Sequence, residues 1–70
     1  MSEPTILVNG ERRPLEDRRL GDLVRRLGID PDRPGIAVAI DDEVVPRAEW
    51  PARELRGGER VEIVGATQGG

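Results

Sequence analysis

Hydrophobic residues recur along the chain with two different periods, and each period indicates a type of secondary structure. Leu20, Leu23, Val24 and Leu27 are spaced like one face of an amphipathic helix, and Gly28 follows as a helix stop. Other segments are rich in β-branched residues or alternate large and small side chains, which is typical of strands. These strand-like segments lie at residues 5–8, 36–40, 43–45 and 60–64. The pattern therefore predicts one helix among several short strands.

Turn residues separate these segments and add a further strand. Asn9-Gly10 is a strong hairpin signal, because both residues tolerate the positive φ angles of a type I′ turn. We therefore expect a second strand near residues 11–16. Pro14 has no N–H group to donate, which favours an edge position or a bulge for that strand. Asp17 is the expected N-cap of the helix.

The order of these elements predicts an α+β fold, with a mixed sheet of four to five strands packed on one helix. A ββαβββ order with a single helix across the sheet is a β-grasp, ubiquitin-like fold. Residues 1–64 would form this domain, and residues 65–70 a flexible C-terminal tail. Trp50 is expected to pack over a small core. That core is expected to contain Ile6, Val8, Leu15, Leu20, Leu23, Val24, Leu27, Val38, Ile40, Leu55, Val61 and Ile63.

The sheet face that does not meet the helix should carry a few apolar side chains. By alternation, Leu7, Ala37, Ala39 and Val64 point to that face. An apolar stripe on an open sheet face can mark a docking surface, and we expect Leu7, Ala39 and Val64 to contact a partner. The alternative is that these are isolated surface apolar residues, which are normal in proteins.

The composition leaves little chemistry to the side chains. The chain has no cysteine, histidine, tyrosine or phenylalanine, and all 11 of its basic residues are arginine. The usual general bases, covalent nucleophiles and soft metal ligands are therefore missing, so no metal site is expected. We do not expect this chain to be an enzyme by itself.

The charge pattern argues against two classes of partner. The net charge is −3, from 14 acidic and 11 basic residues, so no general basic field favours nucleic acid. No apolar run approaches the roughly 20 residues that span a bilayer, and no signal-peptide pattern opens the chain. We therefore expect a cytoplasmic protein that binds neither nucleic acid nor membranes.

The end of the chain is the most conspicuous feature. Gly69-Gly70 closes a short segment of small residues that follows the last predicted strand. Six extended residues reach roughly 20 Å, and glycines can enter a slot too narrow for larger side chains. Such a tail would place the Gly70 carboxylate in another protein's active site, where it must be activated before any acyl transfer. The alternative is an ordinary frayed terminus.

The chain resembles the ThiS-type sulfur carrier proteins of thiamine biosynthesis over nearly its whole length. The Val-Pro-Arg-x-x-Trp stretch at residues 45–50 is the most specific part of the resemblance. The other matching segments are Val8-Asn9-Gly10-Glu11, the helix at residues 20–27, residues 37–40, Leu55-Arg56-Gly57-Gly58-Glu59, residues 61–64 and the terminal Gly69-Gly70.

The resemblance implies a two-step cycle on Gly70, with Gly69 giving access to the partner's active site. An E1-like adenylating enzyme (ThiF-type) would use ATP and magnesium to form an acyl-adenylate, so this chain would bind no cofactor itself. Sulfur from a cysteine desulfurase would then give a thiocarboxylate, which a thiazole synthase (ThiG-type) would accept. The alternatives are a sulfur carrier for molybdopterin, cysteine or tRNA thiolation, or a ubiquitin-like modifier or binding module without sulfur chemistry.

Overall fold

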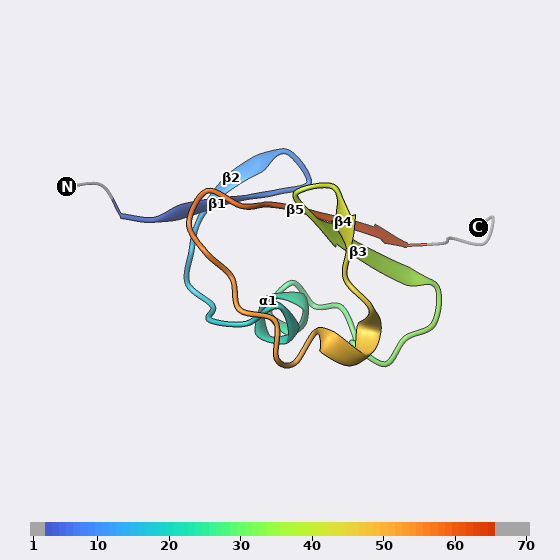
Figure 1. Ribbon diagram of the computed structural model, residues 1–70. Coiled ribbons are helices and arrows are strands. Elements are labelled where there is room, and N and C mark those ends of the chain that lie inside the picture. The colour runs from blue at the N-terminus through green and yellow to red at the C-terminus, as the bar shows by residue number, and fades with distance from the viewer. Residues whose placement is uncertain (1–2, 66–70) are drawn as a thin grey trace.

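A five-stranded mixed sheet with one helix across one of its faces forms the body of the protein (Figure 1). The computed structural model describes residues 3–65 of the chain. Its elements are β1 (Thr5–Val8), β2 (Glu11–Pro14), α1 (Leu20–Arg26), β3 (Ile36–Ile40), β4 (Glu43–Val44), the 3-10 helix η1 (Arg47–Glu49) and β5 (Arg60–Gly65). The α+β, β-grasp prediction is confirmed.

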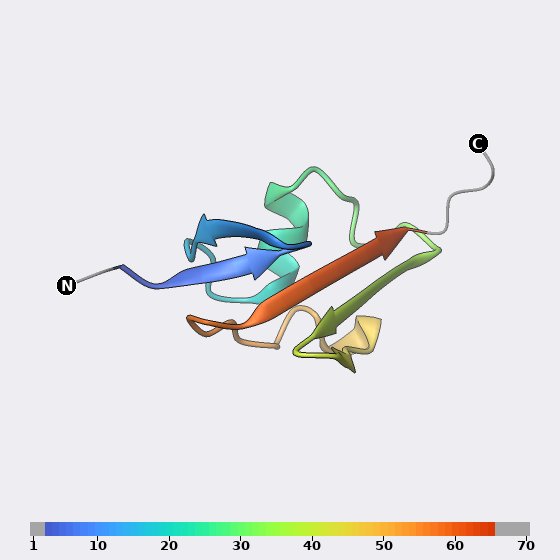
Figure 2. The same cartoon turned by 90° about the horizontal axis from the view of Figure 1, so that it is seen from above.

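The strands lie in the order β2-β1-β5-β3-β4, so β5, the last strand within residues 3–65, is the central strand of the sheet. β5 runs parallel to β1 and antiparallel to β3. Seen from above, β5 lies between these two strands and extends past the end of β1 (Figure 2). The two hairpins, β1–β2 and β3–β4, therefore flank the strand that leads to the C-terminus.

The first hairpin forms as the turn residues predict. Asn9 and Gly10 have φ angles of 52° and 83°, the left-handed values that a type I′ turn requires. Val8 pairs with Glu11 across this turn. The second strand is shorter than expected and ends at Pro14, and it occupies an edge of the sheet, where the missing N–H of proline breaks no ladder.

The start of α1 differs from the prediction. Asp17 does not cap the helix; the N-cap residue is Arg19, and no side chain caps it. Main-chain carbonyls of a distant loop take this role, because Leu20 N–H donates to Arg53 O at 2.8 Å and Gly21 N–H donates to Trp50 O at 2.9 Å. These bonds satisfy N–H groups that every helix start leaves unpaired.

The end of α1 agrees with the prediction. Gly28 has a φ angle of 82°, and its N–H donates to Arg25 O at 2.9 Å. Ile29 N–H donates to Val24 O at 3.1 Å, which completes the usual glycine-terminated helix end.

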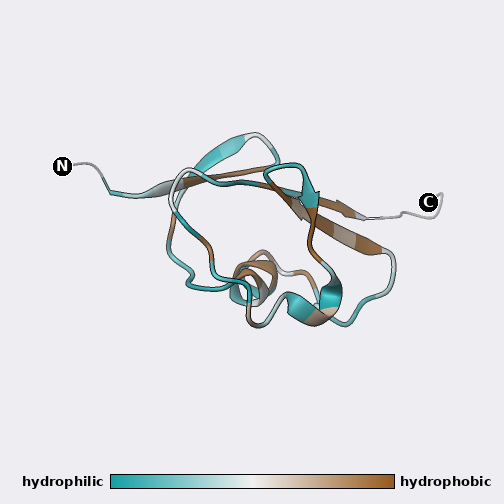
Figure 3. Ribbon diagram, viewed as in Figure 1, coloured by the Kyte–Doolittle hydropathy of each residue, from teal (hydrophilic) through white to brown (hydrophobic). Residues whose placement is uncertain are grey.

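The core lies between the helix and the inner face of the sheet, where apolar residues of both meet (Figure 3). Most of the predicted core residues are buried, but Leu15, Leu27 and Ile63 are only partly buried and pack at its margin. Val45 is buried instead, although the sequence pattern did not place it in the core.

Trp50 is a buried member of the same core. Its side chain is 2% exposed, and its indole Nε1–H donates to Val45 O at 2.9 Å. The predicted packing role of Trp50 is confirmed.

Among residues 3–65, no helix is both long and apolar enough to cross a membrane.

Candidate functional site

The predicted reactive group lies at the end of the chain, and β5 leads to it. β5 continues through Gly65, which pairs with Ile36 of β3, so the strand is one residue longer than the predicted boundary at residue 64. Gly70, the predicted reaction site, and Gly69, predicted to give access to the partner's active site, both lie outside the described residues. The candidate site of the described structure is therefore the root of the tail, at Gly65, and the surfaces next to it.

Asn9 connects the first hairpin to β5 close to this root. Its side-chain Oδ1 accepts a hydrogen bond from Ile63 N–H at 2.8 Å, and its Nδ2 donates to Ile63 O at 3.3 Å. The main-chain N–H of Asn9 also donates to Val61 O at 2.8 Å. The sequence identified Asn9 only as a turn residue, and no local pattern links it to a strand 54 residues away.

Asp41 makes a comparable connection at the start of β5. Its Oδ1 accepts a hydrogen bond from Arg60 N–H at 2.9 Å, and its own N–H donates to Arg60 O at 2.9 Å. Asp42 forms an ion pair with the Arg60 guanidinium at 2.8 Å. The acidic turn at residues 41–42 is thus engaged with the main chain and side chain of Arg60.

The predicted docking residues lie on the sheet face away from α1, which we call the open face. This face carries Leu7 on β1, Arg60, Glu62 and Val64 on β5, Ala37 and Ala39 on β3, and Val44 on β4. Val64 pairs with Ala37, and Ala39 lies one position further along the same face, so Ala39 and Val64 are brought together. Leu7 lies on the other side of β5, next to Arg60.

Val44 extends the apolar part of the open face and was missed in the docking prediction. It pairs with Ala39 and is 72% exposed, compared with 62% for Val64. Its neighbour Val45 is buried, which agrees with the alternation of side chains between the two sides of a strand. The strand was too short for that alternation to be clear from the sequence.

A groove of about 290 Å³ with a mixed polar and apolar lining, which includes Arg33, opens beside Gly65. Leu27, Ile29, Ile36 and Ile63 line it, with Asn9 and Gly65 at the end of the sheet. The incomplete burial of Leu27 and Ile63 is explained by this groove, since it leaves part of each side chain uncovered.

The described side chains form neither a metal-binding cluster nor an unsatisfied buried polar group. Residues 3–65 contain no cluster of three His, Cys, Asp or Glu side chains arranged to hold a metal ion. Their buried side-chain nitrogen and oxygen atoms all have hydrogen-bond partners. The described part of the structure places Gly65 at the end of the central strand, beside the exposed side chains of Val44 and Val64.

Comparison with known proteins agrees with this fold. The fold places the chain among the ubiquitin-like β-grasp proteins, and the structure of the thiamine biosynthesis protein ThiS from Geobacter metallireducens has the same fold. That structure matches with a TM-score of 0.76 at 22% identity, over 94% of this chain and 99% of the other. The model of the ThiS family matches residues 6–70.

A curated relative supports the same assignment at the level of sequence. The sulfur carrier protein ThiS of Thermus thermophilus is 38% identical over 65 residues, which are 93% of this chain and 98% of that protein. The chain belongs to the ThiS family of sulfur carrier proteins.

Proposed function

We propose that this protein carries sulfur for the thiazole ring of thiamine, as a thiocarboxylate on Gly70. The observation that carries the proposal is the family match, which runs through Gly69-Gly70 at the end of the chain. The composition supports it, because a chain without Cys, His, Lys or Tyr has few other groups for covalent chemistry. The chain would act as a protein substrate and not as an enzyme.

The chemistry requires activation of the Gly70 carboxylate by a partner. A terminal carboxylate is ionised at neutral pH and is a poor electrophile. An E1-like adenylating enzyme (ThiF-type), with ATP and magnesium in its own site, would join a carboxylate oxygen to the α-phosphorus and release pyrophosphate. Dependence on ATP is consistent with a cytoplasmic location.

Sulfur transfer would then occur at the acyl carbon of the adenylate. The terminal sulfur of a persulfide, formed by a cysteine desulfurase, attacks this carbon and AMP leaves. A thiol next attacks the remaining sulfur–sulfur bond, forms a disulfide with the inner sulfur and releases the thiocarboxylate. A thiazole synthase (ThiG-type) would accept this sulfur.

The open face would bind these partners while the tail enters their active sites. Ala39 and Val64 form an apolar surface with Ala37 and Val44, and Val64 lies directly before the root of the tail at Gly65. Exposed apolar side chains gathered on one face are typical of interaction sites. Leu7 lies across β5 and would contact the margin of the same partner.

The test is the intact mass of the protein after incubation with ATP, the adenylating partner and a sulfur donor. We expect a mass increase equal to the replacement of one oxygen by sulfur, located in the C-terminal peptide. A matched protein with one alanine added after Gly70 should show no increase, because its diglycine carboxylate is blocked. An unchanged wild-type mass, with a partner that is active on a control carrier, would contradict the proposal.

A second measurement assigns the pathway. The purified thiocarboxylate form should support turnover by thiazole synthase, whereas the unmodified protein should not. Sulfur transfer in molybdopterin, cysteine or tRNA thiolation assays, without thiazole synthase turnover, would instead assign the carrier to one of those pathways. Isopeptide bonds to lysine side chains of other proteins would indicate a ubiquitin-like modifier.

A further inference from the structure

The side chain of Asn9 continues the hydrogen bonding of β1 after the β1 backbone has turned away. β1 and β5 pair in parallel at Leu7↔Arg60 and Val8↔Val61, and then the chain reverses at Asn9-Gly10. Two residues after Val61, at the next hydrogen-bonding position of β5, the Asn9 carboxamide accepts a hydrogen bond from Ile63 N–H and donates one to Ile63 O. The amide of one side chain thus replaces the peptide group that a longer strand would supply.

Asparagine combines two properties that this position needs. It tolerates the left-handed φ of 52° that the turn imposes, as aspartate and glycine also do. Its side chain carries both a donor and an acceptor, whereas ionised aspartate is an acceptor only and glycine has no side chain. Only asparagine among these three residues makes the turn and also satisfies both main-chain groups of Ile63.

The location of this contact gives it a consequence for the tail. Ile63 lies two residues before Gly65, and Val64 and Gly65 pair with β3 on only one side of β5. A strand end held on one side only opens more easily than one held on both. Within residues 3–65, the Asn9 contact is therefore the last connection of β5 on the β1 side.

We propose that Asn9 is a positioning residue for the tail, which holds the end of β5 in the direction that delivers Gly70 to the adenylating partner. This inference rests on the proposed function, because it assigns a role in that reaction. Asn9 touches neither ATP nor the reacting carboxylate in this proposal; it acts through Ile63. The open face that binds the partner would be unaffected by its loss.

Asp41 provides a matched control on the same strand. It has the same φ of 52°, it lies in a tight turn, and its Oδ1 accepts a β5 N–H at 2.9 Å. Its partner is Arg60, at the first residue of β5 and far along the strand from the tail. Asn9→Gly and Asp41→Gly therefore both remove a turn side chain bonded to β5, at opposite ends of the strand.

The experiment measures steady-state adenylation of wild type, Asn9→Gly, Asn9→Asp and Asp41→Gly, as pyrophosphate release at a temperature where each is folded. We expect Asn9→Gly to lower kcat by about three- to tenfold, a range that corresponds to losing one or two hydrogen bonds, with KM changed by less than about twofold. Asp41→Gly should leave both constants within about twofold of wild type, because it does not alter the end of the strand. Amide exchange at Ile63 should accelerate in Asn9→Gly only.

Asn9→Asp tests the two hydrogen bonds separately. It keeps the acceptor for Ile63 N–H and loses the donor to Ile63 O, so exchange at Ile63 should stay slow and kcat should lie between wild type and Asn9→Gly. If Asn9→Gly does not fold, Asn9→Asp decides alone: a lower kcat with unchanged KM supports the proposal, and a wild-type kcat contradicts it.

Three results would overturn the inference while leaving the proposed function intact. These are equal kcat values for Asn9→Gly and wild type, equal losses in Asn9→Gly and Asp41→Gly, and a raised KM with unchanged kcat, which would place Asn9 in the docking contact. Failure of wild type itself to be adenylated, beside an active control carrier, would contradict the proposed function instead.

Discussion

The guanidinium carbon of Arg47 lies 4.7 Å from the centroid of the Trp50 ring, so the arginine stacks on the only aromatic side chain of the protein. The same guanidinium donates hydrogen bonds to the main-chain carbonyls of Pro31, of Arg33 and, at 3.3 Å, of Ile36. Arg47 thereby joins η1 to the loop that precedes β3. This contact gives a structural reason for the Val-Pro-Arg-x-x-Trp stretch at residues 45–50.

We predict that Arg47→Ala lowers the free energy of unfolding by about 2 kcal/mol, because it removes a cation–π contact and charged hydrogen bonds to main-chain carbonyls. Arg47→Lys should recover less than half of this loss, since a single ammonium group cannot replace a planar guanidinium that reaches several carbonyls. Urea unfolding followed by Trp50 fluorescence measures both variants. A full recovery by lysine would show that charge alone, without the fork geometry, stabilises this contact.

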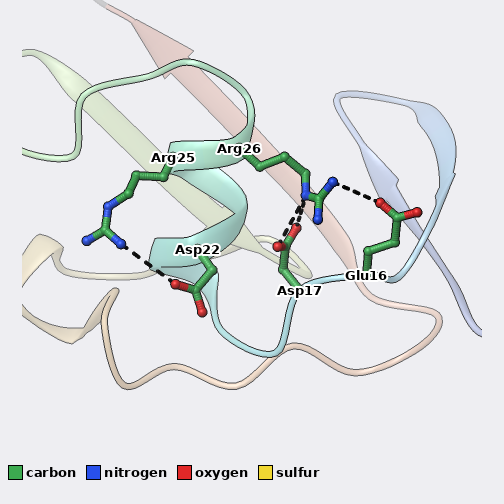
Figure 4. Close-up of polar contacts among 5 residues, drawn as sticks. All are labelled: Glu16, Asp17, Asp22, Arg25 and Arg26. Carbon is green, nitrogen blue, oxygen red and sulfur yellow. Dashed lines mark hydrogen bonds and ion pairs between the residues drawn. The ribbon is translucent and has the colours of Figure 1, made fainter.

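Arg25 and Arg26 of α1 both contact carboxylates (Figure 4). We predict that these two arginines contribute unequally to stability. Arg26 contacts Asp17 at 2.9 Å and Glu16 at 3.0 Å, and the Asp17 side chain is only 12% exposed. Arg25 contacts Asp22 at 3.8 Å, and both of those side chains are largely exposed. Arg26→Ala should cost about 1 kcal/mol, because it leaves a largely covered carboxylate without its partner.

Arg25→Ala is the control for this pair and should cost less than about 0.5 kcal/mol, as is usual for exposed ion pairs. The measurement is urea unfolding at low and at high salt. The difference between the two variants should shrink at high salt, where screening weakens charge pairs near the surface. Equal losses for Arg25→Ala and Arg26→Ala would contradict the prediction.

The β3–β4 turn contains a residue, Asp42, whose replacement by glycine should increase the stability of the fold. Asp42 has a φ of 72°, a left-handed value that costs energy for residues with a Cβ. Its ion pair with Arg60 is exposed on both sides and contributes little. Asp42→Gly should therefore raise the free energy of unfolding by roughly 0.5 kcal/mol, because glycine is preferred at the second position of a type I′ turn.

Asp41→Gly should have the opposite effect, with a loss of about 1 kcal/mol, since it removes the acceptor for Arg60 N–H. Thermal and urea unfolding of the two single variants measure the contrast. A loss in both variants would mean that the Asp42–Arg60 pair outweighs the backbone strain.

The docking surface can be tested with charged substitutions on the open face. Val64→Asp and Val44→Asp should each raise the KM for adenylation by about tenfold, because a buried carboxylate at an apolar contact is costly. Both side chains are largely exposed in the free protein, so stability should change by less than about 0.5 kcal/mol. Ala52→Asp, at an exposed position in the loop after η1, is the control and should leave KM unchanged. An unchanged KM in both Val64→Asp and Val44→Asp would exclude the open face as the surface that binds the adenylating partner.

Local signals accounted for the secondary structure and for most of the core. The period of Leu20, Leu23 and Val24 predicted α1, and the Asn9-Gly10 dipeptide predicted the first hairpin. Both depend on interactions between residues close in the chain, which a sequence displays directly. The alternation along β3 likewise predicted which of its residues face the helix.

The prediction was wrong where a distant segment of the chain accepts hydrogen bonds that the sequence pattern had assigned to a nearby side chain. Asp17 has the right chemistry for an N-cap, but carbonyls of Trp50 and Arg53 bind the first N–H groups of α1, and the Asp17 carboxylate pairs with Arg26. The loop lies close to Gly21, where an added Cβ would lie 3.4 Å from Pro51 Cα, in ordinary van der Waals contact. Local propensity cannot anticipate such a contact.

The sequence by itself determined the element order, the membership of the ThiS family and the diglycine end on which the proposed chemistry depends, because turn chemistry, periodicity and motifs lie within short stretches of chain. The tertiary structure alone decided that Asn9 braces Ile63 and that Val44 joins Ala39 and Val64 on one face. These contacts depend on strand register, which is set when Val8 and Val61 are buried side by side. That register brings Asn9 and Ile63, which are 54 positions apart in the chain, within hydrogen-bonding distance.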